Sequence, residues 1–256
     1  MPQLSAVIIT FNEARNIARC LDSLSGIADE VLVLDSFSTD QTEQICRERG
    51  VRFIQHAFDG HIEQKNRALA AAAHPLVLSL DADEALSDTL RQSILAVKNN
   101  WRYDAYAMNR RTNYCGQWIA HSGWYPDRKI RLFDRRLGKW GGTNPHDKVE
   151  FESPQTTVHL AGDILHYSYY SIEEHITQNN KFSTISAESY FNRGKKTSLF
   201  NIFFNPCWAF FSGFILRGGF RDGFYGYVIA RNVAHLTFLK HSKLFLLQRK
   251  AAKGEK

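Results

Sequence analysis

The chain has 256 residues, of which 44% are hydrophobic, so it can bury a sizeable core and form one large domain with an extension. Its formal charge of +6 is unevenly distributed. Residues 217–256 carry nine Lys or Arg and two acidic residues, whereas the remaining residues carry 23 Lys or Arg and 24 acidic residues. This distribution excludes a uniformly basic nucleic-acid-binding face and indicates a near-neutral body with a basic tail. Four cysteines without paired or metal-ligand spacing, and an amino terminus without a basic and then apolar leader, favour a reducing cytoplasm.

The first hundred residues alternate short apolar strands with amphipathic segments. Buried strands are expected over residues 6–10, 30–34, 51–54 and 76–80. Helices are expected over 13–24, from 38 or 39 to 50, over 61–73 and over 87–99. Asn12 is placed to cap the first helix, and Ser38 or Thr39 the second. Strands that alternate with helices predict βαβ units, and therefore an α/β fold with a mostly parallel sheet flanked by helices.

After residue 104 the pattern changes to short strands and turns. The candidate strands cover residues 105–111, 129–133, 157–160 and 163–166. Aromatic residues of this half either stack on sugar rings or belong to the core: Trp118, Trp124 and Tyr125. A helix is expected over 171–193, because acidic residues in its first turn complement the helix dipole.

Residues 197–216 form a segment of twenty residues without a charge. Its length allows a membrane span, but Asn201, Asn205 and Pro206 interrupt the apolar run. Many aromatic rings with basic residues at both ends are typical of a helix that lies at a membrane surface. A buried core helix or an oligomer contact is the third interpretation. Residues 225–245 form a second aromatic and basic segment, which is expected to lie beside the first.

The most informative motif is the acidic pair Asp81 and Asp83, which directly follows the strand at 76–80. Open α/β sheets bind ligands at the carboxyl ends of their strands, and carboxylates suit a Mg²⁺ or Mn²⁺ ion that bridges to substrate phosphates. A helix cap or a solvated turn is the alternative. Residues 10–13 and 35–40, which end the first two strands, are expected at the same edge. Since no GxGxxG or Walker loop is present, a metal is the expected phosphate-binding element.

Four motifs, in this order, resemble the family 2 inverting, nucleotide-sugar-dependent glycosyltransferases with the GT-A fold. They are Ala-Val-Ile-Ile-Thr-Phe-Asn-Glu at 6–13, Val-Leu-Asp-Ser-Phe-Ser-Thr-Asp at 33–40, Gln-Lys-Asn-Arg-Ala-Leu at 64–69 and Leu-Ser-Leu-Asp-Ala-Asp-Glu at 78–84. Further motifs resemble the bacterial lipopolysaccharide-core β-1,4-glucosyltransferases: His-Asp-Lys-Val at 146–149, Ile-Leu-His-Tyr at 164–167 and Gly-Phe-x-Asp-Gly at 219–223.

The resemblance implies a nucleotide-binding role for five residues. Thr10, Asn12 and Glu13 fall where the family lines the nucleotide pocket. Asp35 falls where the family contacts the uracil, and Lys65 where a basic side chain faces the nucleotide.

The resemblance also implies a metal site and a catalytic base. Asp81 matches the acid near the ribose and the metal, and Asp83 matches the direct ligand of Mg²⁺ or Mn²⁺, which offsets charge on the departing diphosphate. His166 is a candidate for a further ligand, and a hydrogen-bonded histidine at a strand end is the alternative.

Inversion by single displacement needs a base that takes the acceptor hydroxyl proton. Asp147 is the expected base, although the related enzymes more often have Glu at this position. Asp127 and Glu150 are the rivals, and a surface ion pair with Lys148 or an arginine is the non-catalytic interpretation of Asp147.

The sequence thus predicts an enzyme that transfers a hexose, with UDP-glucose the expected donor, to a lipid-linked saccharide such as the lipopolysaccharide inner core. The expected partners are the donor, the acceptor and an anionic membrane surface, without nucleic acid, and an oligomer is compatible with the sequence. The expected location is the cytoplasm, peripheral on the cytoplasmic face of the inner membrane. The alternatives are a non-catalytic nucleotide-sugar or nucleic-acid binding module and a metal-dependent nucleotidyltransferase.

Three segments are expected to divide these tasks. Residues 1–100 form the nucleotide-sugar-binding half of the GT-A domain, and residues 101–194 the acceptor-binding half. Residues 195–256 form an aromatic and basic helical extension that contacts a membrane surface or another subunit.

Overall fold

The computed structural model describes residues 2–143 and 146–253. The chain divides into two compact units. Unit 1 contains residues 1–111 and 127–167, and unit 2 contains residues 112–126 and 168–256. The division of the sequence into segments 1–100, 101–194 and 195–256 stays a prediction.

Unit 1 begins with the four parallel strands that the sequence predicts. They pair in the order β3-β2-β1-β4, and every pairing among them is parallel. The apolar runs of β1 and β4 are buried, which is typical of the central strands of a parallel sheet covered on both faces. The strands and the helices between them are β1 (Leu4–Thr10), α1 (Ile17–Ser23), β2 (Glu30–Asp35), α2 (Thr42–Glu48), β3 (Arg52–Gln55), α3 (His61–Ala71) and β4 (Leu76–Asp81).

The second half of unit 1 extends the sheet with mostly antiparallel strands. The order continues from β4 through β8, β6 and β11 to β5, with β7 paired to β6, while β9 and β10 form a separate hairpin. These elements are β5 (Glu84–Leu86), α4 (Asp88–Asn99), β6 (Ala105–Tyr114), β7 (Gln117–Trp118), β8 (Asp127–Asp134), β9 (Gly138–Thr143), β10 (His146–Phe151) and β11 (Thr157–Tyr169). Strands β6 and β11 begin in unit 1 and end in unit 2.

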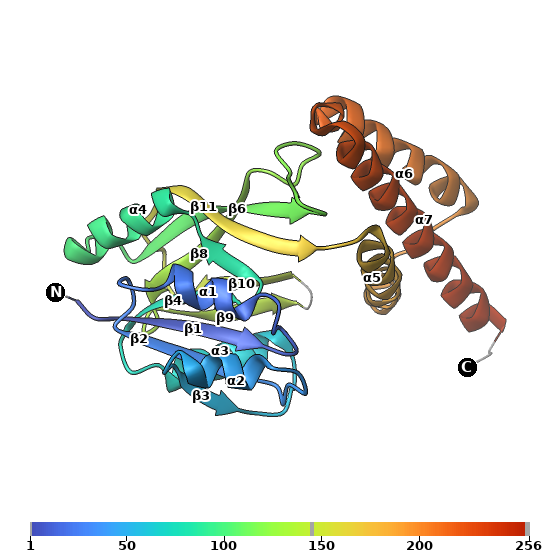
Figure 1. Ribbon diagram of the computed structural model, residues 1–256. Coiled ribbons are helices and arrows are strands. Elements are labelled where there is room, and N and C mark those ends of the chain that lie inside the picture. The colour runs from blue at the N-terminus through green and yellow to red at the C-terminus, as the bar shows by residue number, and fades with distance from the viewer. Residues whose placement is uncertain (1, 144–145, 254–256) are drawn as a thin grey trace. The chain divides into compact units, whose positions relative to one another are not determined.

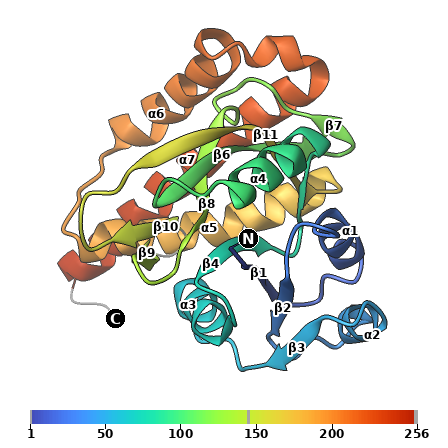
Figure 2. The same ribbon diagram turned by 90° about the vertical axis from the view of Figure 1, so that its left-hand side faces the viewer.

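Side chains of β1 alternate between two cores. Helices α1 and α2 lie on one side of the parallel strands and α3 lies on the other (Figure 2). Ala6 and Ile8 face a cluster that includes residues of α1, α2 and α4. Val7 faces a second cluster, with Leu69 of α3 and Trp140 of β9. Because successive strand residues point to opposite faces, the continuous apolar run of β1 fills both cores.

The predicted helix starts are wrong for α1 and α2. Asn12 does not cap α1, which begins four residues after the predicted start at Glu13; instead its Oδ1 accepts a hydrogen bond from the Thr39 N–H at 2.8 Å. Ser38 and Thr39 do not cap α2 either, because the Ser38 N–H and hydroxyl donate to the Asp35 carboxylate. Ser87 does cap α4, accepting from the Leu90 N–H at 3.3 Å.

The two strands predicted over 157–160 and 163–166 are one strand, β11. Gly162 lies between them with φ of +95°, and a Cβ atom there would meet the Leu90 backbone nitrogen at 2.3 Å. Glycine therefore lets β11 pass α4 without interruption, whereas the sequence analysis divided this stretch into two strands.

Unit 2 is mainly helical. Helix α7 packs beside both α5 and α6, so the second aromatic segment lies beside the first, as predicted (Figure 1). A small core joins Tyr114, Ile119 and Ile229, and Trp124 packs against it as a core residue. The helices are α5 (Ile172–Asn192), α6 (Leu199–Phe211), a π-helix (Ser212–Leu216), a 3₁₀-helix (Gly219–Asp222) and α7 (Gly223–Lys253).

The Gly-Phe-x-Asp-Gly motif joins the turn before α7 to residues 117–121. Buried Asp222 accepts hydrogen bonds from the Ala120 N–H at 3.2 Å, the His121 N–H at 2.9 Å and the His121 ring at 2.9 Å. A Cβ atom on Gly226 would lie 1.8 Å from the Gly219 carbonyl oxygen, so only glycine allows this close approach. The motif therefore has a structural role within unit 2.

Candidate active site

The ends of three parallel strands meet at one edge of unit 1, as predicted. Thr10 is in register with Asp35, and Ile9 is in register with Asp81. The Thr10 hydroxyl is buried and has no hydrogen-bond partner among the described residues. The sequence prediction that these segments converge is confirmed.

Asp35 holds the loop that follows β2. Its carboxylate is fully buried and accepts from the Ser38 N–H at 2.8 Å and from Gln55 at 3.3 Å. The neighbouring Asn12 N–H donates to the Ser38 hydroxyl at 2.8 Å. The predicted nucleotide-binding residues Asn12 and Asp35 therefore belong to one hydrogen-bonded loop system, in which Asp35 is not exposed to a ligand.

Glu13 has an unusual acidity for a carboxylic acid. Burial raises its pKa to about 7, the hydrogen bond from Asn16 at 2.7 Å opposes this shift, and the negative charge of Asp83 adds to it. Near neutral pH a substantial fraction of Glu13 is therefore protonated and able to donate a hydrogen bond.

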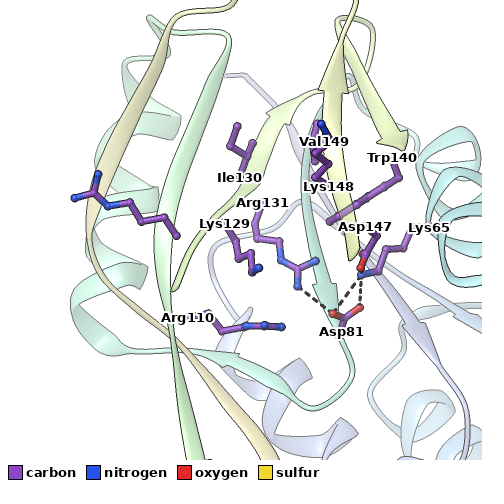
Figure 3. Close-up of a pocket in the computed structure, with 11 residues that line it drawn as sticks. Lys65, Asp81, Arg110, Lys129, Ile130, Arg131, Trp140, Asp147, Lys148 and Val149 are labelled. Carbon is purple, nitrogen blue, oxygen red and sulfur yellow. Dashed lines mark hydrogen bonds and ion pairs between the residues drawn. The ribbon is translucent and has the colours of Figure 1, made fainter. Parts of the chain in front are cut away.

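Lys65, Asp81 and Asp147 form a charged cluster (Figure 3). The Lys65 ammonium lies 2.6 Å from Asp147 and 3.0 Å from Asp81, and it stands 4.4 Å from the centre of the Trp140 ring. Burial alone would raise the pKa of both carboxyl groups, but Lys65 and Arg131 hold the pKa of Asp81 far below its ordinary value, and Lys65 lowers that of Asp147. Three residues from α3, β4 and β10, predicted from separate motifs, thus meet here.

Beneath this cluster lie two charged residues that the sequence analysis missed. Glu84 is fully buried; it accepts from the Asp81 N–H at 3.0 Å and from Arg131 at 2.8 Å. Arg131 also bonds Asp81 at 3.0 Å. The available signals were the position of Glu84 directly after the acidic pair and an arginine within the apolar half of a strand.

Asp83 and His166 lie together next to the cluster. Asp83 follows β4, His166 belongs to β11, and the His166 Nε2 lies 3.1 Å from an Asp83 oxygen. No group of three or more His, Cys, Asp or Glu side chains able to hold a metal occurs in the described part of the chain. The arrangement offers one carboxylate and one imidazole, which suits a divalent cation that takes its remaining ligands from substrate and water.

The charged cluster lies at a cavity of about 580 Å³ in unit 1. Its lining is rich in basic side chains, which favours an anionic ligand. The lining residues are Lys65, Asp81, Arg110, Arg128, Lys129, Ile130, Arg131, Trp140, Asp147, Lys148 and Val149.

Of the three acids considered as the base, Asp147 is the one that lines this cavity. Asp127 pairs with Arg110 at 2.8 Å and with Lys129 at 3.0 Å. Glu150 pairs with Lys148 at 3.2 Å, so Lys148 is not the ion-pair partner of Asp147.

Comparisons with known proteins agree on one family. Residues 5–153 match the model of glycosyl transferase family 2. An uncharacterized glycosyltransferase of Rickettsia felis is 34% identical over 95% of this chain and 90% of its own length. The lipopolysaccharide core biosynthesis glycosyltransferase LpsC of Rhizobium meliloti is 30% identical over 98% of this chain and 94% of its own length.

Among solved structures, glucosyl-3-phosphoglycerate synthase from Mycobacterium tuberculosis, in complex with Mn²⁺, UDP and glucosyl-3-phosphoglycerate, is similar to part of the chain. It covers 44% of each chain with 25% identity and a TM-score of 0.37.

Proposed function

We propose that this chain, which belongs to glycosyl transferase family 2, transfers a hexose from a UDP-sugar to a lipid-linked saccharide of the lipopolysaccharide core, with inversion. Glucose is the expected sugar. The observation that carries the proposal is the convergence of Lys65, Asp81 and Asp147 at a basic cavity beside the ends of β1, β2 and β4. A nucleotidyltransferase or a binding module lacks such support, because the family and the relatives are glycosyltransferases.

The donor lies along the strand ends. Thr10, Asn12 and Glu13 line the nucleotide pocket, and protonated Glu13 donates a hydrogen bond to it. Asp35 reaches the uracil only when Ser38 or Gln55 gives up its hydrogen bond, since the carboxylate is buried in the free enzyme.

Asp83 and His166 are the residues that would hold Mg²⁺ or Mn²⁺, and their 3.1 Å approach supports this assignment. When bound, the ion supplies a positive charge that stabilises the departing diphosphate. Asp81 stays ionised beside it, because the hydrogen bond from Arg131 and the charge of Lys65 favour the carboxylate.

Asp147 takes the proton of the acceptor hydroxyl. In the free enzyme the ion pair with Lys65 lowers its pKa and so weakens it as a base. The diphosphate of the donor competes for the Lys65 ammonium, and release of Asp147 from this pair returns its pKa toward the ordinary range. Donor binding therefore strengthens the base before transfer occurs.

The acceptor sets the location of the enzyme. LpsC acts, by its name, in lipopolysaccharide core biosynthesis, and a lipid-linked saccharide is held at a membrane. We place the chain at the cytoplasmic face of the inner membrane as a peripheral protein, where UDP-sugars are available.

The test is a panel of UDP-sugars with Mg²⁺ or Mn²⁺, scored for UDP release with and without a delipidated, truncated lipopolysaccharide core oligosaccharide. UDP-glucose is expected to give acceptor-dependent release. Asp83→Asn should lower that rate by about 100-fold, because a metal ligand is lost. Asp22→Asn is the matched control: Asp22 lies on α1, outside the cavity, and pairs with Arg49, so the rate should not change. Absence of UDP release with every sugar, or equal rates for the two variants, would contradict the proposal.

A further inference from the structure

Helix α6 and the π-helix after it carry an exposed apolar surface. Residues 199–216 have a mean hydropathy of 1.5, yet only 6% of these residues are buried. Phe200 and Phe203 are each 70% exposed. We call the exposed large side chains of this segment the aromatic face: Leu199, Phe200, Phe203, Phe204, Trp208, Phe211, Ile215 and Leu216. A core helix is thus excluded as the interpretation of this segment in the described chain.

The opposite side of α6 packs on α7. Ile202 is its buried residue, and Asn205 lies 3.0 Å from the His241 ring. Nearer the turn, the rings of Phe210 and Phe214 each contact Tyr227, at 5.8 Å between centroids. Asn205, one of the polar residues that interrupt the apolar run, is therefore turned toward α7 and away from the aromatic face.

The charges around the aromatic face are of one sign. From Ser189 to Lys253 the sequence contains a single acid, Asp222, and that residue is buried. Exposed basic residues lie at both ends of the apolar segment: Lys195, Lys196, Arg217 and Arg221. Unit 2 as a whole contains 13 Lys or Arg and 5 Asp or Glu, a net charge of +8. An apolar surface with this border complements a layer of anionic headgroups above acyl chains.

We propose that the aromatic face lies flat in an anionic bilayer surface, with its rings at the boundary between headgroups and acyl chains. It does not span the membrane. Since α7 pairs with α6 from Tyr227 to His241, a spanning α6 would carry the exposed Arg231 into the hydrocarbon. The inference deepens the proposed function and rests on it only for the membrane-linked acceptor.

The test measures sedimentation of the full-length protein with vesicles of phosphatidylcholine alone or mixed equally with phosphatidylglycerol. Binding to the anionic vesicles is expected, with release by high salt or by alkaline carbonate. The double variant Phe200→Ser/Phe203→Ser should bind at least about tenfold more weakly, because two exposed rings leave the bilayer boundary. Its UDP release with a delipidated acceptor should equal that of the unaltered protein, so a failure of the proposed glycosyl transfer is seen separately.

Leu137→Ser, in the turn between β8 and β9 of unit 1, is the control for loss of an exposed apolar side chain, and it should bind like the unaltered protein. Arg217→Gln/Arg221→Gln should lose several-fold in binding to anionic vesicles. Equal binding by the double phenylalanine variant, equal binding to neutral vesicles, or retention after carbonate would overturn the proposal. A further result would also overturn it: a dimer in the absence of lipid, which the double phenylalanine variant converts to monomers, together with no binding to vesicles. A second copy of the chain would then cover the aromatic face.

Discussion

Lys65 satisfies three neighbours from one buried position. Its side chain is 5% exposed, and it contacts Asp81, Asp147 and the face of Trp140. Burying an ammonium is costly unless carboxylates compensate for the lost water, and two do so here. In the proposed function an incoming diphosphate competes with Asp147 for this ammonium, so Lys65 would serve the chemistry as well as the stability of the fold.

Glu13 makes the stability of the fold depend on pH. Its folded-state pKa is about 7 and its ordinary value is 4.5, so between these values the folded state binds more protons than the unfolded state. Stability is therefore lost as pH rises from about 4.5 to 7. Glu13→Gln removes this loss while keeping the acceptor for Asn16. The free energy of unfolding, measured in urea, should fall between pH 5 and pH 8 by about 2 kcal/mol more in the unaltered protein than in the variant. A constant difference between the two pH values would refute the shifted pKa.

The site residues divide by what local sequence can reveal. Asp81, Lys65 and Asp147 lie in motifs at strand ends or on a helix, where the family resemblance gave them roles in advance. Glu84 and Arg131 lacked such a signal. They belong to β5 and β8, which are far apart in sequence, and they form a buried ion pair next to Asp81 only in the folded chain. Long-range burial of charge cannot be read from periodicity.

At the scale of elements, Asn66 of α3 binds the backbone of the hairpin of β9 and β10. Asn66 donates to the Trp140 carbonyl at 2.8 Å and accepts from the Trp140 N–H at 2.9 Å. The hairpin pairs with itself and lies outside the main sheet, and it carries Asp147. Asn66 therefore aligns the proposed base with Lys65, its neighbour on α3.

Asn66→Ala should destabilise the protein by about 2 kcal/mol, because both backbone groups of the buried Trp140 lose their partner. The turnover number should fall while the KM for the donor changes less, since Asp147 is displaced and the strand ends are intact. Urea unfolding and initial rates measure the two effects. Arg67→Ala, on the same helix but paired with exposed Asp59, should alter neither. Unchanged turnover in Asn66→Ala would show that the hairpin is held by other contacts.

Helices and strands were predicted correctly where their positions follow from buried apolar residues. The predictions were less accurate where polar side chains form hydrogen bonds within loops. The four parallel strands follow from apolar runs that fill two cores. The starts of α1 and α2 were mispredicted, because Asn12 and Ser38 form hydrogen bonds between the loops after β1 and β2 and do not cap a helix. Strand β11 was mispredicted at Gly162, since a glycine can mark a turn or a close approach and local sequence does not distinguish them.

At the scale of the whole molecule, the excess of basic residues is confined to unit 2, the unit that also carries the aromatic face. Unit 2 has a net charge of +8, and unit 1 holds 19 Lys or Arg against 21 acids, a net charge of −2. The sequence revealed the basic tail, but not that residues 112–126 complete the same unit. That grouping depends on contacts such as the one between Asp222 and His121.

Asp222→Ala should destabilise unit 2 by about 3 kcal/mol, because two backbone N–H groups and the His121 ring lose their acceptor. Hydrogen exchange should accelerate at residues 119–122 and 219–226 and stay unchanged in β1 and β4. Glu188→Ala removes an exposed acid from α5 of the same unit and should leave exchange as it was. Faster exchange throughout the chain would mean that the two units unfold together.

The division of the chain has a consequence for engineering. Unit 2 is assembled from an insertion, residues 112–126, and from the carboxyl-terminal residues that begin at Ser168. A stop codon placed before α6 would remove Asp222 and leave the inserted segment with an unpaired histidine and uncovered aromatic rings. Shortened proteins of this kind would aggregate for reasons unrelated to lipid. A chimaera that borrows unit 2 for another catalytic domain must therefore transplant both segments at once.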